Sequence, residues 1–68
     1  MGKLTDKQWV ELVRAVVDYN NQGLRLGQAY MNALHMIKPE LYTEISQTDA
    51  DCFYHDDNIV NFIRFLND

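Results

Sequence analysis

Apolar residues recur at steps of three and four in three separate stretches of this chain, and this spacing restricts its fold more than any other feature. The most regular stretch is Leu26, Ala29, Tyr30, Ala33, Leu34 and Ile37. An earlier stretch is Trp9, Leu12, Val13, Val16 and Tyr19, and a later one is Ile59, Phe62, Ile63 and Leu66. Such spacing gives an α-helix one apolar face. Because no stretch alternates as a strand does, we predict an all-α domain over residues 1–68, a small bundle of three helices plus one short helix around a single core.

The first helix has a complete start signal. Thr5 is placed as the N-cap and Gln8 as the third helical residue, a pair that forms a capping box. Leu4 and Trp9 have the spacing of a hydrophobic staple across the same boundary. Gly23 suits the left-handed conformation that ends helices. The sequence therefore predicts a helix that begins after Thr5 and ends before Gly23.

Pro39 separates the second helix from a short third one. Lys38, which precedes the proline, is biased out of the α region, so the second helix should end there. Pro39 itself suits the first position of a new helix. We predict a short helix from Pro39 to Ser46 that turns Leu41 and Ile45 inward.

The segment from Thr48 to Asp57, called here the acidic–aromatic loop, combines carboxylates with large aromatics and lacks helical spacing. Flexible linkers are not built from residues such as Cys, Phe and Tyr, so we expect an ordered loop. Phe53 and Tyr54 should be partly buried on the core. Asp56 or Asp57 is expected to cap the last helix.

The length of the chain limits how much surface it can bury. A domain of 68 residues buries roughly 60% of the surface of its unfolded chain, so the core is thin. We expect Trp9, Tyr30 and Phe62, one from each main helix, to meet there. With Cys52 as the single cysteine, no disulfide can form within the chain, which indicates a reducing, cytoplasmic location. The chain has neither the apolar run of a signal peptide nor a membrane-spanning segment, so we expect a soluble protein.

Charge is divided unevenly along the sequence. Residues 1–38 have a net charge of +2 and residues 39–68 a net charge of −6, which sum to −4. Residues 39–63 contain no Lys or Arg but six carboxylates: Glu40, Glu44, Asp49, Asp51, Asp56 and Asp57. Because non-specific affinity for nucleic acid comes from Lys and Arg, this balance argues against direct nucleic-acid binding. It favours a basic protein partner, although surplus carboxylates also serve simply to keep a small domain soluble.

The carboxylates of the acidic–aromatic loop do not match a calcium motif. If Asp49 and Asp51 were the first two ligands of an EF-hand, the positions that require glycine and glutamate would be Tyr54 and Val60. Helix capping and solvation are the ordinary roles of such carboxylates. The sequence therefore predicts no metal site.

Cys52 matches neither a zinc site nor an activated nucleophile. His35, His55 and Cys52 lack the paired spacing of zinc ligands. A reactive thiolate needs positive surroundings, whereas neighbouring aspartates raise the pKa of this thiol. We expect Cys52 to be a buried apolar side chain. No phosphate-binding glycine loop or nucleophile motif is present, so we predict neither a cofactor nor an enzyme.

The second helix carries a polar stripe opposite its apolar face. The stripe consists of Gln28, Asn32 and His35, and the neighbouring positions are Arg25, Met31 and Met36. Polar stripes are usually solvated surface, but Arg and Met are enriched at the centres of protein interfaces. A DNA-binding helix-turn-helix is excluded electrostatically, because the second helix has one firm cation and an acidic region follows it.

Four short motifs resemble a recurrent type of small, uncharacterised helical protein carried by bacteriophages and some bacteria. They are a tryptophan in the first helix, an Arg-x-Gly-Gln-Ala-x-x-Asn-x-Leu run, a Leu-Tyr pair and an acidic Asp-x-Phe-Tyr-x-Asp segment, here Trp9, Arg25 to Leu34, Leu41-Tyr42 and Asp51 to Asp56 or Asp57. That family has glycine and proline where this chain has Gln47 and Cys52. The resemblance implies a phage accessory protein acting in the host cytoplasm, and it implies no catalytic residue. It also indicates that the loop and the Arg25 to Leu34 face form one unit, in which Arg25 or Gln28 pairs with Asp51 or a neighbour.

We therefore expect a small acidic protein–protein interaction module that acts on a host or phage protein. The residues expected to bind the partner are Asp49, Asp51, Phe53, Tyr54, Asp56, Asp57, Arg25, Gln28 and Asn32. An alternative is an acidic mimic of nucleic acid that inhibits a DNA- or RNA-handling enzyme. A third hypothesis is a homo-oligomer that buries Val10, Val17 and Phe65, the apolar residues outside the main stripes.

Overall fold

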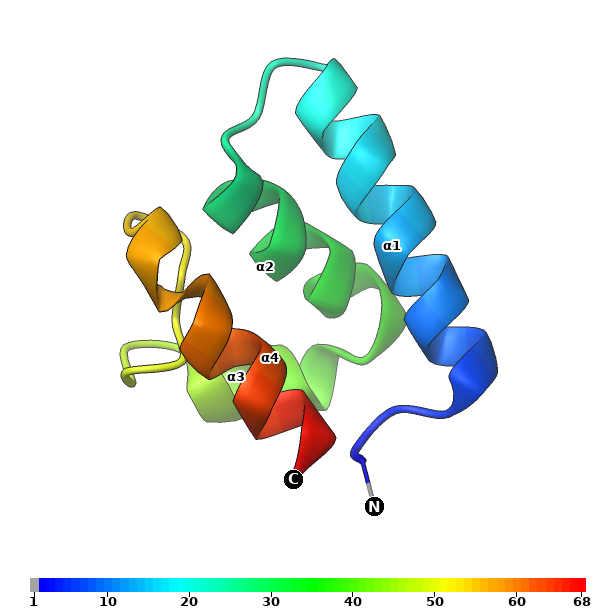
Figure 1. Cartoon of the computed structure of the whole chain (residues 1–68), viewed down its shortest axis with the longest axis vertical. Helices are drawn as coiled ribbons and strands as arrows, with labels where there is room; N and C mark the ends of the chain where they lie inside the picture. The colour runs from blue at the N-terminus through cyan, green and yellow to red at the C-terminus, as the bar shows by residue number, and fades with distance from the viewer. Residues whose placement is uncertain (1) are drawn as a thin grey trace.

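The chain folds into four α-helices and one 3-10 turn, as a computed structural model that describes residues 2–68 shows (Figure 1). The elements are α1 (Asp6–Asn21), α2 (Leu26–Ile37), α3 (Pro39–Ile45), the 3-10 turn η1 (Asp56–Asn58) and α4 (Ile59–Asn67). Residues 2–68 contain no strand. The prediction of an all-α bundle of three helices plus one short helix is confirmed.

The start of α1 is the predicted one. Thr5 Oγ1 accepts a hydrogen bond from the Gln8 amide at 3.1 Å, and Gln8 Oε1 accepts one from the Thr5 amide at 2.9 Å. Gly23, beyond the end of the helix, has φ +104°, the left-handed conformation expected of it. The capping box and the terminating glycine are confirmed.

The inward face of α1 differs from the predicted stripe at one position. Leu12 and Val16 are buried as expected, but Ala15 completes the buried face and Val13 is 53% exposed. Steps of three and four allow a helix to turn either side of its stripe toward a neighbour. Here α1 packs against α2 with the side that carries Ala15.

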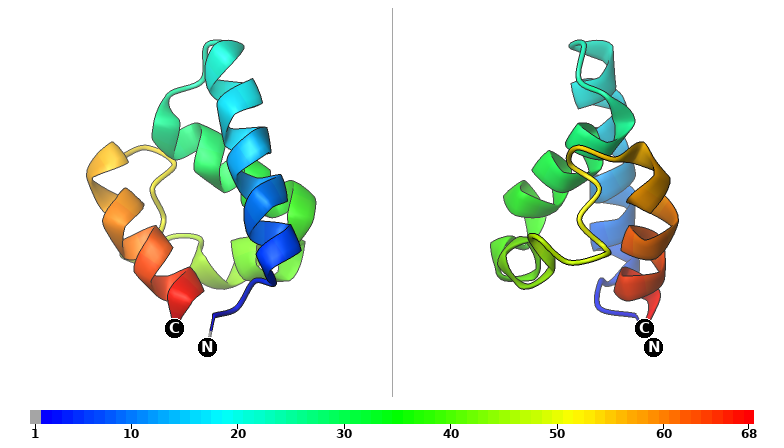
Figure 2. Two further views of the ribbon diagram at one scale, coloured as in Figure 1. Left: turned by 45° about the vertical axis from the view of Figure 1, so that its right-hand side comes forward. Right: turned by 90° about the vertical axis from the view of Figure 1, so that its left-hand side faces the viewer.

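Helix α2 is the centre of the bundle, with α1 along one side and α4 on the other (Figures 1 and 2). Its buried residues span most of its circumference: Gly27, Ala29, Met31, Ala33 and Leu34. Small side chains at Ala29 and Ala33, both 0% exposed, let neighbouring elements approach closely. Met31, considered above as part of a contact face beside the polar stripe, is instead buried in the core at 1% exposure.

The helices end and begin around Lys38 as the proline requires. Lys38 is extended, with φ −149° and ψ 77°, and Pro39 opens α3. Leu41 and Ile45 are buried, as predicted. The Lys38 ammonium donates to the carbonyl of Lys3 at 3.0 Å, which ties this corner to the beginning of the chain.

The start of α4 corrects a prediction. Neither Asp56 nor Asp57 caps the helix; both lie in the 3-10 turn η1, and the residue before α4, Asn58, makes no side-chain capping bond. Asp56 instead accepts a hydrogen bond from α2, 29 residues away in the chain. The stripe of α4 is confirmed, with Phe62 and Leu66 at 0% exposure.

The core brings together the three predicted aromatics to different degrees. The rings of Tyr30 and Phe62 meet edge to face with centroids 5.4 Å apart, and Phe62 is fully buried. Trp9 is half-buried and packs at the margin of the same cluster. Tyr30 is also half-buried, so Phe62 is the one of the three aromatics that lies fully inside the core.

The two ends of the chain are joined beside α4. The Lys3 amide donates to the Leu66 carbonyl at 2.7 Å, and the Lys3 ammonium donates to the Phe65 carbonyl at 3.0 Å. That ammonium also lies 4.3 Å from the centroid of the Phe65 ring. Because the last carbonyls of a helix have no partners within it, a cation at this position stabilises the end of α4.

Candidate functional site

The acidic–aromatic loop is held against the beginning of α2 by a backbone contact at Gly27. The Gly27 amide donates to Asp56 Oδ1 at 2.9 Å, and the Cys52 thiol donates to the Gly27 carbonyl at 3.4 Å. A Cβ at position 27 would lie 1.9 Å from the Cys52 carbonyl oxygen, so only glycine fits. This contact anchors both ends of the segment that carries Phe53 and Tyr54.

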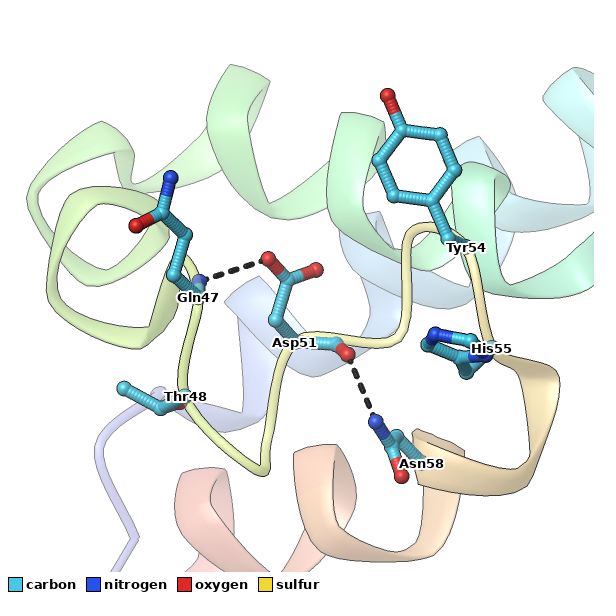
Figure 3. Close-up of a pocket in the computed structure, with 6 residues that line it drawn as sticks. All are labelled: Gln47, Thr48, Asp51, Tyr54, His55 and Asn58. Carbon is cyan, nitrogen blue, oxygen red and sulfur yellow. Dashed lines mark hydrogen bonds between the residues drawn. The ribbon is translucent and has the colours of Figure 1, made fainter.

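Asp51 organises the loop from within. One carboxylate oxygen accepts from the Gln47 amide at 2.8 Å and the other from the Phe53 amide at 3.0 Å. The carbonyl of Asp51 accepts from the Asn58 side chain at 3.1 Å (Figure 3). An aspartate that bonds the amide two residues ahead forms an Asx turn, which fixes the local backbone without regular secondary structure. The expectation of an ordered loop agrees with this network.

The expected pairing of Arg25 or Gln28 with Asp51 or a neighbour is replaced by these backbone contacts. Gln28 Oε1 accepts from the Arg25 amide at 3.4 Å, so the glutamine side chain supports the start of its own helix. Arg25 is exposed. The loop and α2 do form one unit, as expected, but the link runs through Gly27 and Asp56.

Gln47 adopts a backbone conformation that is unusual for its residue type. Its φ is +66°, the one positive value outside glycine in residues 2–68. Non-glycine residues enter this region at a cost of roughly 1–2 kcal/mol. The bond from its amide to Asp51 holds it there. Glycine is the residue that adopts this conformation without cost.

Two shallow hollows lie on either side of Tyr54 and share Asp51 and Gln47. The first has a volume of about 290 Å³ and is lined by Gln47, Thr48, Asp51, Tyr54, His55 and Asn58 (Figure 3). The second has a volume of about 260 Å³ and is lined by Tyr42, Ser46, Gln47, Asp51, Phe53 and Tyr54. Each hollow thus combines an aromatic wall with the Asp51 carboxylate.

Three of the nine predicted partner-binding residues line these hollows, and six do not. Asp51, Phe53 and Tyr54 line one or both hollows, whereas six other predicted residues line neither: Asp49, Asp56, Asp57, Arg25, Gln28 and Asn32. Tyr54 is 72% exposed, so the expectation that it packs on the core is wrong. Phe53 is half-buried and does pack there.

Sequence reasoning missed six of the nine residues that line the two hollows. Tyr42 in α3 and Ser46 just after it line the second hollow, Gln47 lines both, and Thr48, His55 and Asn58 complete the first. Tyr42 lies inside the acidic region of the sequence, which was a usable signal. The others carry no motif, because what brings them together is the path of the loop.

Asp56 and Asp57 form a matched pair for testing the anchor at Gly27. Asp56→Ala removes the acceptor for the Gly27 amide and should lower the free energy of unfolding by about 1 kcal/mol. Asp57→Ala removes the same charge from the neighbouring exposed position and should change stability by less than about 0.5 kcal/mol. Urea unfolding of both variants measures the difference, and equal effects would contradict the anchor.

Cys52 is a buried structural residue, as predicted. The side chain is 0% exposed, and burial raises the pKa of its thiol from 9.0 to about 12, with the charges of Asp51 and Asp56 adding to the effect. At pH 9 about half of unfolded chains would carry the thiolate, against about one folded chain in a thousand. The thiol is therefore unreactive while the domain is folded.

The raised pKa of Cys52 predicts a loss of stability in alkali. Since the folded pKa lies above the unfolded one, the stabilisation is complete below pH 9 and is lost as pH rises from 9 toward 12. Urea unfolding at several pH values, compared between the wild type and Cys52→Ala, isolates this effect from the titration of tyrosine and lysine. The advantage of the wild type should shrink above pH 9, and parallel curves would contradict the prediction.

Residues 2–68 contain neither a cluster of metal-binding side chains nor a helix that could cross a membrane. Nowhere in this range do three or more His, Cys, Asp or Glu side chains gather as metal ligands would. In the same range, each helix is too short or too polar to cross a bilayer.

A second surface lies on the outer face of α1. Val10, Val13 and Val17, called here the valine stripe, are each between 52% and 54% exposed. With Trp9 and Arg14, the first two of them line an apolar groove of about 410 Å³. Phe65, expected to join this surface, is half-buried under the Lys3 ammonium instead.

Comparisons of the chain with protein families, with curated proteins and with solved structures found no match.

Proposed function

We propose that this protein is a protein-binding module whose acidic–aromatic loop docks on a basic segment of a partner. The observation that carries the proposal is Tyr54, a large aromatic side chain 72% exposed on a loop that is otherwise tied down. Exposed tyrosines in fixed surroundings are common anchors of protein interfaces.

The bonds within the loop support binding with little loss of entropy. Asp51, Asp56 and Asn58 connect the loop to itself, to α2 and to η1. Ordering a flexible segment on binding would cost affinity, and a segment already held in place avoids that cost. Tyr54 is thus presented on a nearly rigid support.

The charge of the surrounding region supports a basic partner. Residues 39–63 carry six carboxylates and no Lys or Arg, and Asp49, Asp56 and Asp57 are exposed on the same loop as Tyr54. Complementary potentials raise association rates and exclude partners of like charge. A segment rich in Arg or Lys therefore fits this surface best.

Selection from a random peptide library against the immobilised protein tests the proposal, because it does not require the partner to be identified first. Enriched peptides should have net positive charge, and Tyr54→Ala should weaken them by about tenfold or more, the size expected of an interface anchor. Val60→Ala, which truncates a side chain 60% exposed on α4, is the matched control and should leave binding unchanged.

Two results of this selection would contradict the proposal. One is that no peptide binds in a Tyr54-dependent manner. The other is that binding falls steeply with salt and ignores Tyr54, which would favour the acidic mimic of nucleic acid, because a surface that acts by charge alone is screened within about 10 Å at 0.1 M salt.

Self-association through α1 is a second candidate function, favoured by the valine stripe. Val10, Val13 and Val17 repeat at steps of three and four, the spacing of a helix that packs against another helix. Sedimentation at high micromolar concentration should then show a dimer that Val13→Glu abolishes. A monomeric wild type at that concentration would remove this candidate.

A further inference from the structure

We propose that the second hollow, between α3 and the acidic–aromatic loop, is a binding site for an arginine side chain of the partner. The proposal rests on the proposed function and assigns the chemical group that the site recognises.

Three aromatic side chains wall the second hollow. They are Tyr42 from α3 and Phe53 and Tyr54 from the loop. The rings of Phe53 and Tyr54 are 4.8 Å apart at 72°, so they form two nearly perpendicular sides. Tyr42 is held in turn by the ring of His35, 4.8 Å away at 73°. Perpendicular aromatic walls are how proteins surround organic cations, because the negative faces of the rings attract positive charge.

The Asp51 carboxylate supplies the charge. Asp51 lines the same hollow, and the hydrogen bonds that it accepts come from the neutral amides of Gln47 and Phe53. Those bonds fix the position of the carboxylate and leave its negative charge in place. No Lys or Arg occurs in residues 39–63, so neither the loop nor α3 supplies a cation of its own.

Hydration decides between the two common cations. The hollow is open to water, so a bound group keeps part of its hydration and gains mainly from contact with the rings. A lysine ammonium is strongly hydrated and compact, whereas a guanidinium is planar, weakly hydrated and stacks on aromatic faces. Its five donors can also reach the remaining lone pairs of Asp51 and the hydroxyl of Ser46, which uses its own proton on the Tyr42 carbonyl.

The first hollow fits a cation less well. It has one aromatic wall, Tyr54, and its other lining includes His55 and the amide of Asn58. The Asn58 side-chain amide already donates to the Asp51 carbonyl. The second hollow is therefore the one that we assign to the arginine side chain.

Titrations of the full chain with four short peptides, followed by amide NMR shifts, test this assignment. The peptides are identical except at the central residue, which is arginine, lysine, citrulline or trimethyllysine. Citrulline has the shape of arginine without its charge. We expect the arginine peptide to bind at least threefold more tightly than the lysine peptide and the citrulline peptide not to saturate. The shifts should cluster at Ser46, Gln47, Phe53 and Tyr54.

Variants of the protein locate the site. Tyr54→Ala, at an exposed position, should weaken the arginine peptide at least fivefold, and Val60→Ala, on α4 and outside the hollow, should not. Asp51→Asn should weaken it as well. If Asp51→Asn disturbs the loop, which its amide spectrum would reveal, the citrulline peptide alone tests the charge.

Three outcomes would overturn the assignment: equal binding of arginine and lysine, tighter binding of trimethyllysine than of arginine, or shifts confined to His55 and Asn58. The basic peptides selected from the library distinguish failure of the arginine site from failure of the proposed protein-binding function. If they depend on Tyr54 but accept lysine equally, the protein-binding function stands and the arginine site falls. If no selected peptide depends on Tyr54, both fall.

Discussion

Replacing Gly27 with alanine should destabilise the domain by about 3 kcal/mol, although the same exchange inside an ordinary helix is stabilising by up to about 1 kcal/mol. The sign reverses because the new Cβ would lie 1.9 Å from the Cys52 carbonyl oxygen and 2.7 Å from Asp56 Oδ1. Relief requires the loop to move away from α2, which breaks the bond between the Gly27 amide and Asp56.

Urea unfolding followed by circular dichroism measures this effect. A core of this size rarely supplies more than about 3–5 kcal/mol, so a large fraction of the variant should be unfolded at room temperature. Gly23→Ala is the control, because no atom lies within 4 Å of a Cβ there and its φ of +104° makes backbone conformation the sole cost. A Gly27→Ala variant as stable as the wild type would show that the loop does not sit on α2.

Truncating Phe62 to alanine should have an effect of similar size for a different reason. Phe62 is 0% exposed and packs edge to face on Tyr30, with ring centroids 5.4 Å apart. Removing a buried phenylalanine side chain costs about 3–5 kcal/mol, since it combines lost apolar burial with a cavity. In a domain this small that is most of the stability, so we expect loss of cooperative unfolding.

Two variants on α4 control this prediction. Val60→Ala removes an apolar group that is 60% exposed and should cost less than about 0.5 kcal/mol. Phe62→Leu keeps most of the buried volume and should cost about 1.5 kcal/mol. If Val60→Ala and Phe62→Ala were equally harmful, α4 would have to turn a different face toward α2.

The positions of the helices were predictable because their signals are local. Thr5 and Gln8 exchange hydrogen bonds three residues apart, and Pro39 restricts the residue beside it. Such interactions lie within one turn of chain, so their residue pattern is sufficient. The same holds for the apolar stripe of α4.

The candidate site was only partly predictable. The loop could be located from its composition, and Asp51, Phe53 and Tyr54 do line the hollows. The burial of each aromatic side chain could not be predicted, because the sequence Phe53-Tyr54 is compatible with either ring facing inward. In the structure Phe53 packs on the core and Tyr54 faces water.

Asp56 shows how a local pattern and a distant contact compete for one group. As an aspartate ahead of a helix it is an ordinary N-cap, yet its carboxylate binds the Gly27 amide, 29 residues away. Val13 on α1 is a second example. It fits the apolar stripe of the sequence, but α1 packs with Ala15 buried and leaves Val13 exposed.

The number, the order and the approximate bounds of the helices follow from the sequence alone, because caps, prolines and apolar periods act over about four neighbouring residues. Tertiary packing then determines which face of each helix is buried. It also determines that the Asp56 carboxylate binds α2 and does not cap α4, and that Tyr54 is the aromatic exposed to water. Those choices depend on contacts such as the one between Gly27 and Cys52, where atoms 25 residues apart compete for the same space. Steric exclusion and burial between distant segments cannot be predicted from a short stretch of sequence. These two effects determine the surface around Tyr54.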